Sequence, residues 1–146
     1  MAETEPIVVS VEVDAAPARV FTLLTEPAAL VTWWADVAEL EPRVGGRVRL
    51  VFELNEITGR ITRFEPPSTL AFTWTPPGRP DVETEVTFTL AELAPERCRV
   101  EVVHSGWEHA PELRPPHQVG WRHYLGCLAD LVAGRPVDKT FPEVPV

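Results

Sequence analysis

The histidines are the residues of this sequence whose chemistry is most suited to catalysis. His104 shares the strand parity of Cys98, Val100 and Val102, so its side chain is expected to point with them toward an apolar face. An imidazole with an ordinary pKa of about 6.5 could there donate a hydrogen bond to a ligand or act as a general base. It could also be a core histidine bonded to a neighbouring carbonyl group, because the sequence shows no paired carboxylate or activated nucleophile around it.

The spacing of the histidines and cysteines does not favour a metal centre. His104, His109, His117 and His123 are separated by five, eight and six residues, and no two of them have the helical i, i+4 spacing of shared ligands. Two cysteines, Cys98 and Cys127, stand far apart without a Cys-x-x-Cys pair, so we expect reduced thiols. We expect no metal and no cofactor, and we expect His117 and His123 to be solvated or to cap the final helix.

Large aromatic rings are the second group with a possible role in binding. By strand and helix parity they converge on one inner face, where they could line a pocket or fill the core. Tyr124, Trp107 and His104 would supply the polar contacts of such a pocket. The candidate ligand-binding residues are Trp33, Trp34, Phe52, Phe72, Trp74, Val86, Phe88, His104, Trp107, Trp121 and Tyr124.

Hydrophobic periodicity predicts the elements that position these side chains. Ile7–Val13 alternates with period two and is rich in β-branched residues, which predicts a first strand. Pro17 opens a predicted helix that ends near Thr25, and a second short helix begins after Thr25-Glu26-Pro27. Gly45-Gly46 predicts a tight turn before a run of strands.

Five period-two segments follow this turn and predict a meander. Short connections that contain proline or asparagine separate them, so neighbouring segments are expected to pair in one curved antiparallel sheet. The segments are Val48 to Leu54 (with Val48, Leu50, Phe52 and Leu54 on one face), Ile57 to Phe64, Thr69 to Trp74, Val82 to Leu90, and Arg97 to His104.

The last third of the chain returns to helical periodicity. Apolar residues from Trp121 to Val132 line one stripe, and Gly134 followed by Pro136 ends the predicted helix from His117 to Ala133. The fold class is therefore α+β, with a curved antiparallel sheet wrapped around a long C-terminal helix and two short helices after the first strand. We expect one domain over 1–146, with a core from 7 to 134 and a tail from 135 to 146.

Length and charge narrow the range of partners. The chain has 146 residues, with 13 Lys and Arg against 22 Asp and Glu, for a net charge of −9. An acidic surface repels phosphate backbones, so nucleic acid is not an expected partner. The sequence shows neither a long apolar span nor a signal peptide, so we expect no membrane insertion and a cytoplasmic location.

Six short segments that contain tryptophan or glycine and occur in one order along the chain carry a family resemblance. They are Leu30-Val31-Thr32-Trp33-Trp34, Pro42-Arg43-Val44-Gly45-Gly46-Arg47-Val48, Gly59-Arg60-Ile61, Leu70-Ala71-Phe72-Thr73-Trp74, His104-Ser105-Gly106-Trp107 and Gly120-Trp121-Arg122-His123-Tyr124-Leu125. Together they resemble the activator-of-Hsp90-ATPase homologue family. This family lies within the START-related (SRPBCC) superfamily, which shares the helix-grip fold of the birch pollen allergens. The resemblance covers about 7–131.

The resemblance implies a scaffold that binds lipids or other small molecules, because START-related domains hold apolar ligands between the sheet and the long helix. Some relatives are cyclases or hydrolases. Eukaryotic Hsp90 activators that resemble this domain also carry a separate N-terminal domain, for which 146 residues leave no room. We therefore do not expect an Hsp90-type chaperone as a partner.

Three functions remain open from the sequence. The first is binding of a small hydrophobic molecule, lipid-like or aromatic, in a cavity between sheet and helix. The second is a cyclase- or hydrolase-type enzyme in which His104 or Tyr124 moves protons. The third is a protein-interaction or co-chaperone-like module that uses the acidic surface or an exposed sheet edge. The strand Ile7–Val13 could also pair with a second copy in a homodimer.

Overall fold

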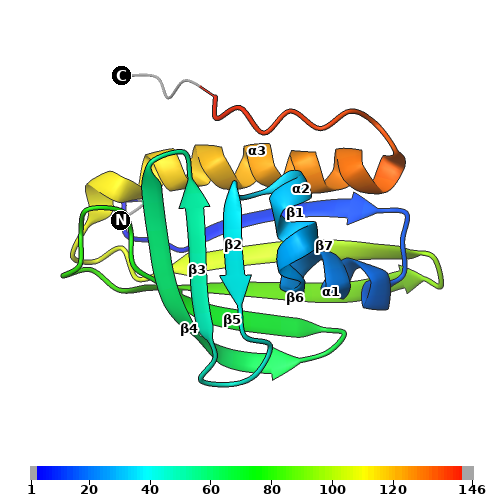
Figure 1. Ribbon diagram of the computed structural model, residues 1–146, viewed down its shortest axis with the longest axis horizontal. Helices are drawn as coiled ribbons and strands as arrows, with labels where there is room; N and C mark the ends of the chain where they lie inside the picture. The colour runs from blue at the N-terminus through cyan, green and yellow to red at the C-terminus, as the bar shows by residue number, and fades with distance from the viewer. Residues whose placement is uncertain (1–2, 143–146) are drawn as a thin grey trace.

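A long helix lies across the concave face of a curved antiparallel sheet in the computed structural model, which describes residues 3–142 (Figure 1). Within these residues the sheet has seven strands: β1 (Ile7–Val13), β2 (Val37–Leu40), β3 (Arg47–Phe52), β4 (Asn55–Glu65), β5 (Thr69–Trp74), β6 (Thr84–Ala94) and β7 (Arg97–Ser105). The helices are α1 (Pro17–Thr25), α2 (Pro27–Trp33), the short 3-10 helix η1 (Pro111–Leu113) and α3 (Arg114–Ala133). The α+β helix-grip prediction is confirmed.

The sheet is an open meander from β2 to β7, and the first strand, β1, is added at its β7 edge. Its order is β1-β7-β6-β5-β4-β3-β2, so every pair from β2 to β7 joins consecutive strands. The first strand pairs antiparallel with β7, with Ile7 opposite His104 and Val13 opposite Cys98. This register places His104 on the same face as the buried ends of β1, toward α3.

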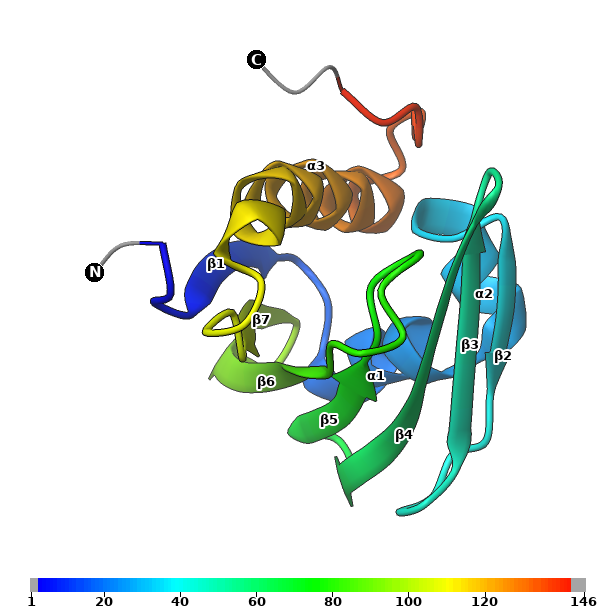
Figure 2. The ribbon, with the colours of Figure 1, turned by 90° about the vertical axis from the view of Figure 1, so that its left-hand side faces the viewer.

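A sharp bend in β4 gives the sheet its curvature. The strand pairs with β5 from Ile61 opposite Phe72 onward, and before that it makes a single bridge from Thr58 to Thr75, the residue after β5. Gly59 lies between Thr58 and Ile61, where a Cβ atom would collide with the carbonyl oxygen of Thr73. The bend turns β2, β3 and the start of β4 away from β5–β7 and toward α3 (Figure 2).

The ends of α3 follow from proline and glycine. Pro115 and Pro116 lie in its first turn, where the missing N–H donors would have no helical partner in any case. The helix therefore begins at Arg114, three residues before the predicted start at His117. Gly134 ends it with a φ of 74°, as predicted.

Two parts of the strand prediction were wrong or incomplete. Only Leu40 of the four residues of β2 is buried, so this short edge strand has no period-two pattern and was not predicted. Leu54 was expected to continue the buried face of β3, but its side chain is 98% exposed. The strand ends at Phe52, which pairs with Asn55, so Glu53 and Leu54 form a two-residue turn.

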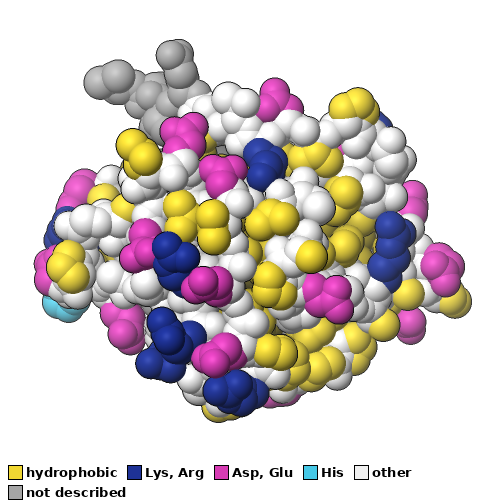
Figure 3. Space-filling model, viewed as in Figure 1, with side chains coloured by type: hydrophobic (Ala, Val, Ile, Leu, Met, Phe, Trp, Pro, Cys, Tyr) yellow, Lys and Arg dark blue, Asp and Glu magenta, His cyan; other side chains and the backbone are white. Residues whose placement is uncertain are grey.

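Charged side chains cover the outer face of β2–β4. Acidic and basic groups lie next to one another on this face (Figure 3). Arg49 illustrates the pattern, because its Nε lies 2.7 Å from Glu56 and its Nη1 3.6 Å from Glu39. The hydrogen bond to Glu56 raises the pKa of Arg49. Exposed ion pairs such as these contribute little to stability, so the apolar core carries most of it.

The helices of the described residues do not include a candidate membrane span. None of them is both long enough and apolar enough to cross a bilayer.

Candidate functional site

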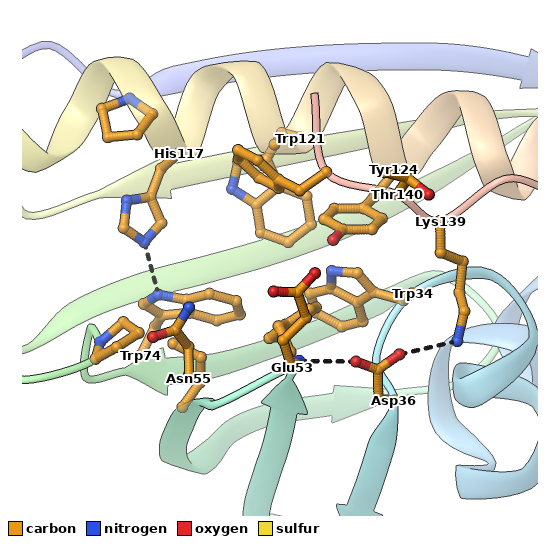
Figure 4. A pocket seen from close by; sticks show the side chains of 16 residues that line it. Trp34, Asp36, Glu53, Asn55, Trp74, His117, Trp121, Tyr124, Lys139 and Thr140 are labelled. Atoms are coloured by element: carbon orange, nitrogen blue, oxygen red, sulfur yellow. Dashed lines mark hydrogen bonds and ion pairs between the residues drawn. The ribbon is translucent and has the colours of Figure 1, made fainter. Parts of the chain in front are cut away.

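The bend in β4 leaves a cavity of about 620 Å³ between the β3–β4 turn and α3 (Figure 4). Residues on α3, among them Gly120, Trp121 and Tyr124, form one wall. Phe52 and Trp74 face them from the sheet. Trp34 and Asp36 close one side from the segment after α2, and Lys139, Thr140 and Phe141 reach the cavity from the segment after α3.

Aromatic rings make a continuous floor for this cavity. Trp34 lies at the centre, stacked on Trp33 with 5.3 Å between ring centroids and on Trp74 with 5.9 Å. Its ring also contacts Trp121 at 5.3 Å. This arrangement follows from the sequence spacing, because Leu30 and Trp33 bury the inner face of α2 and Trp34 caps its C-terminal end.

His104 lies beneath this floor and is fully buried. The indole N–H of Trp121 donates to its Nδ1 at 2.9 Å, so the ring proton is on Nε2. That N–H donates to Thr84 Oγ1 at 2.7 Å, and the Thr84 hydroxyl in turn donates to the carbonyl oxygen of Trp74 at 2.8 Å. Both ring nitrogens are therefore occupied, and neither faces the cavity.

His117 is held in the same way at the edge of the cavity. Trp74 Nε1–H donates to its Nε2 at 3.2 Å, so its Nδ1–H donates to the carbonyl oxygen of Leu113 at 2.7 Å. The predicted capping role is not observed, because no side chain caps the N-terminus of α3, and the ring is bonded within the protein instead of being solvated. Burial lowers the pKa of His117, and burial together with the nearby His117 lowers that of His104 well below its ordinary value.

These two pKa shifts predict a loss of stability in mild acid. Because both histidines have a lower pKa in the folded state than in the unfolded chain, the unfolded chain takes up protons first as pH falls. Stability is complete above the unfolded pKa of about 6.5 and should fall below it, by at most about 1.4 kcal/mol per pH unit for each histidine. Urea unfolding at pH 7.5 and 5.5 measures this loss. Equal unfolding free energies at the two pH values would contradict it.

Charged groups gather at the mouth of the cavity. Lys139 Nζ donates to the carbonyl oxygens of Val31 at 2.8 Å and Ala35 at 3.1 Å and lies 3.4 Å from Asp36 Oδ1. The other oxygen of Asp36 accepts the backbone N–H of Glu53 at 2.7 Å. This N–H bond first, and Lys139 second, lower the pKa of Asp36. The contacts tie the segment after α3 and the β3–β4 turn to the end of α2.

The Tyr124 hydroxyl is a polar group that remains free for a ligand. It makes no hydrogen bond to any residue in the described range, and Figure 4 shows it pointing into the cavity. Burial, together with the nearby Cys127, Asp36 and Glu53, raises the pKa of Tyr124 to about 12. The hydroxyl therefore keeps its proton at neutral pH.

The structure divides the eleven predicted binding residues into two groups. Five of them line the cavity: Trp34, Phe52, Trp74, Trp121 and Tyr124. The other six are at most 1% exposed and lie in the core behind it: Trp33, Phe72, Val86, Phe88, His104 and Trp107. The indole N–H of Trp107, expected to reach a ligand, donates to the backbone carbonyl oxygen of His104 at 2.9 Å. That any of these residues binds a ligand stays a prediction.

Several cavity residues were not among the candidates. Sequence periodicity did not indicate them, because most lie in turns or in the aperiodic segment after α3. They are Asp36, Glu53, Asn55, Ile57, Pro77, Pro116, His117, Gly120, Lys139, Thr140 and Phe141. Alternation places Ile57 on the same side of its strand as Ile61, but this pattern did not place the residue at the cavity.

The placement of possible metal ligands and the burial of the two cysteines are defined for residues 3–142. These residues contain no group of three or more His, Cys, Asp or Glu side chains placed to hold a metal ion. Cys98 and Cys127 are free and buried, and burial raises the pKa of both thiols.

The sequence and the structure were compared with those of known proteins. No match was found among curated protein sequences. Among solved structures, CalU16 from Micromonospora echinospora is 26% identical, with a TM-score of 0.73 over 88% of this chain and 76% of that one. The Aha1 dimer from Colwellia psychrerythraea is 22% identical, with a TM-score of 0.76 over 87% and 95% of the two chains. PFC0360w, described as an HSP90 activator from Plasmodium falciparum, is 18% identical, with a TM-score of 0.75 over 90% and 98%. The family model described as activator of Hsp90 ATPase homolog 1-like protein matches residues 14–133, most of the sequence, and the chain therefore belongs to this family.

Proposed function

We propose that the protein binds a small hydrophobic molecule, lipid-like or aromatic, in the cavity between the β3–β4 turn and α3. The observation that carries this proposal is a volume of about 620 Å³ with an aromatic floor and polar groups gathered at its mouth. Small-molecule sites typically have such volumes and such linings. The free hydroxyl of Tyr124 would orient the ligand, and the rings of Trp34, Trp74 and Trp121 would supply most of the affinity.

Binding can be tested with N-phenyl-1-naphthylamine, a neutral dye whose fluorescence rises in apolar surroundings. We expect the purified protein to bind the dye saturably. Native mass spectrometry should show one bound dye molecule per chain. Absence of saturable dye binding would count against the proposal.

Substitution of Gly120 by leucine should block this cavity. Gly120 faces the cavity on α3, where a Cβ atom would already lie 3.1 Å from the ring of Phe141. We expect dye affinity to fall at least tenfold while the protein stays folded, because the Phe141 ring is 43% exposed and can move aside, and leucine favours helix over glycine by about 0.8 kcal/mol. Gly126→Leu is the matched control, because Gly126 lies on the same helix with no neighbour within 4 Å of its Cβ position. Equal dye affinity in both variants would place the site elsewhere.

The enzymatic alternative now depends on Tyr124 more than on His104. Both ring nitrogens of His104 are bonded within the core, so the geometry offers no lone pair or proton to a ligand. The Tyr124 hydroxyl reaches the cavity, but its pKa of about 12 suits it to donate a hydrogen bond and not to act as a base near pH 7.

A protein partner is the second candidate function. PFC0360w is described as an HSP90 activator and the Colwellia protein as a dimer, and both share this fold. The edge strand β1 leaves Val8 56% exposed, which would suit pairing with a second copy. Sedimentation equilibrium of the purified chain tests the homodimer directly. Free buried thiols at Cys98 and Cys127 support a reducing compartment such as the cytoplasm for either function.

A further inference from the structure

The Glu53 carboxylate faces the cavity without a positively charged partner. Figure 4 shows it directed toward the space beside Tyr124 and Trp34. No hydrogen bond or ion pair joins this side chain to another residue within 3–142. Its backbone has a φ of 56°, in the left-handed region that non-glycine residues seldom adopt. The bond from its N–H to Asp36 holds the residue in this conformation, with the carboxylate at the mouth of the cavity.

The one cationic side chain that lines the described cavity is already engaged. Lys139 has three N–H donors, and they are directed to Val31, Ala35 and Asp36. A ligand carboxylate or phosphate would have to break these contacts and approach both Asp36 and Glu53. The fixed charges of the mouth therefore disfavour an anion.

The remaining groups of the mouth suit a cation. The electron-rich faces of tryptophan, tyrosine and phenylalanine attract ammonium and guanidinium groups, most strongly tryptophan. Trp74, Trp121 and Tyr124 supply such rings within one cavity, and the Asn55 side chain adds a carbonyl acceptor beside Glu53. Clusters of aromatic rings recognise alkylated ammonium ligands, and a carboxylate beside the rings adds charge attraction.

We infer that the ligand of this cavity is an organic cation, with an apolar body on the aromatic floor and an ammonium or guanidinium group beside Glu53. This inference rests on the proposed small-molecule site and adds the charge of its ligand. The net charge of −9 acts in the same direction, because it raises the concentration of cations near the surface.

Three ligands that share one apolar body test the inference. They are 2-(2-naphthyl)ethyltrimethylammonium, 2-(2-naphthyl)ethanol and 2-naphthylacetate, each titrated by displacement of the neutral dye at low salt. We expect the ammonium compound to bind about tenfold more tightly than the alcohol. One cation–π contact and one partly exposed charge pair together account for a difference in affinity of this size. The acetate should bind more weakly than the alcohol.

Glu53→Gln should lower the preference for the ammonium compound over the alcohol about threefold, which is the part that the charge pair provides. Glu56→Gln is the matched control, because it removes the same charge from the outer face of the same hairpin, where Glu56 contacts Arg49. A preference that is undiminished in Glu53→Gln, or falls equally in both variants, overturns the role of Glu53. Equal affinity of the wild type for all three compounds overturns only the inference that the ligand is a cation, because the cavity would still bind small molecules. Failure of the dye and all three compounds to bind overturns the small-molecule site as well.

Discussion

Substitution of His104 by alanine is expected to lower the free energy of unfolding by about 3–5 kcal/mol. The change empties a ring-sized space in the core. It also leaves the Trp121 N–H without its acceptor and the Thr84 hydroxyl without its donor. Urea unfolding monitored by tryptophan fluorescence measures the effect.

A catalytic role for His104 predicts the opposite outcome. An acid–base residue at a ligand site could be removed with little loss of stability, and turnover alone would disappear. His109→Ala is a suitable control, because His109 is exposed in the loop before η1 and its removal should change stability by less than about 0.5 kcal/mol. If His104→Ala unfolds at the wild-type urea concentration, the hydrogen-bond chain through the core does not contribute as described here.

Gly59→Ala should destabilise the protein by about 3 kcal/mol or more. Its Cβ would collide with the backbone carbonyl of Thr73, and a backbone atom cannot rotate away as a side chain can. The strands β4 and β5 would have to separate at the bend that opens the cavity. We therefore expect a lower thermal midpoint and weaker dye binding in the fraction that remains folded.

Gly126→Ala provides the comparison for this effect. Gly126 lies on α3 with open space around its Cβ position, so alanine should stabilise the helix by about 0.5–1 kcal/mol. Opposite shifts of the two thermal midpoints would show that the bend, and not the loss of a glycine as such, matters at position 59. Equal shifts would mean that the sheet accommodates a side chain at the bend.

The sequence alone determined most of the elements of this fold. Period-two alternation identified β1 as Ile7–Val13 and β5 as Thr69–Trp74, both with the observed ends. Proline and glycine set the ends of helices correctly at Pro17 and Gly134, because their backbone restrictions act locally. Where local pattern was absent, as in β2, the prediction failed, because pairing with β3 alone makes those four residues a strand.

Only the tertiary structure decided which of the inward residues face the cavity. Parity assigned both Trp74 and His104 to the inner face, yet the first lines the cavity and the second lies behind it. Strand parity predicts which face of the sheet a side chain occupies, but not the distance from that face to α3. The bend at Gly59 sets this distance. The hydrogen bonds that hold these groups join Trp121 to His104 across 17 positions and Trp74 to His117 across 43. Such contacts, like those of Glu53 and Lys139 at the mouth, depend on how the folded chain brings distant segments together, which no local spacing encodes.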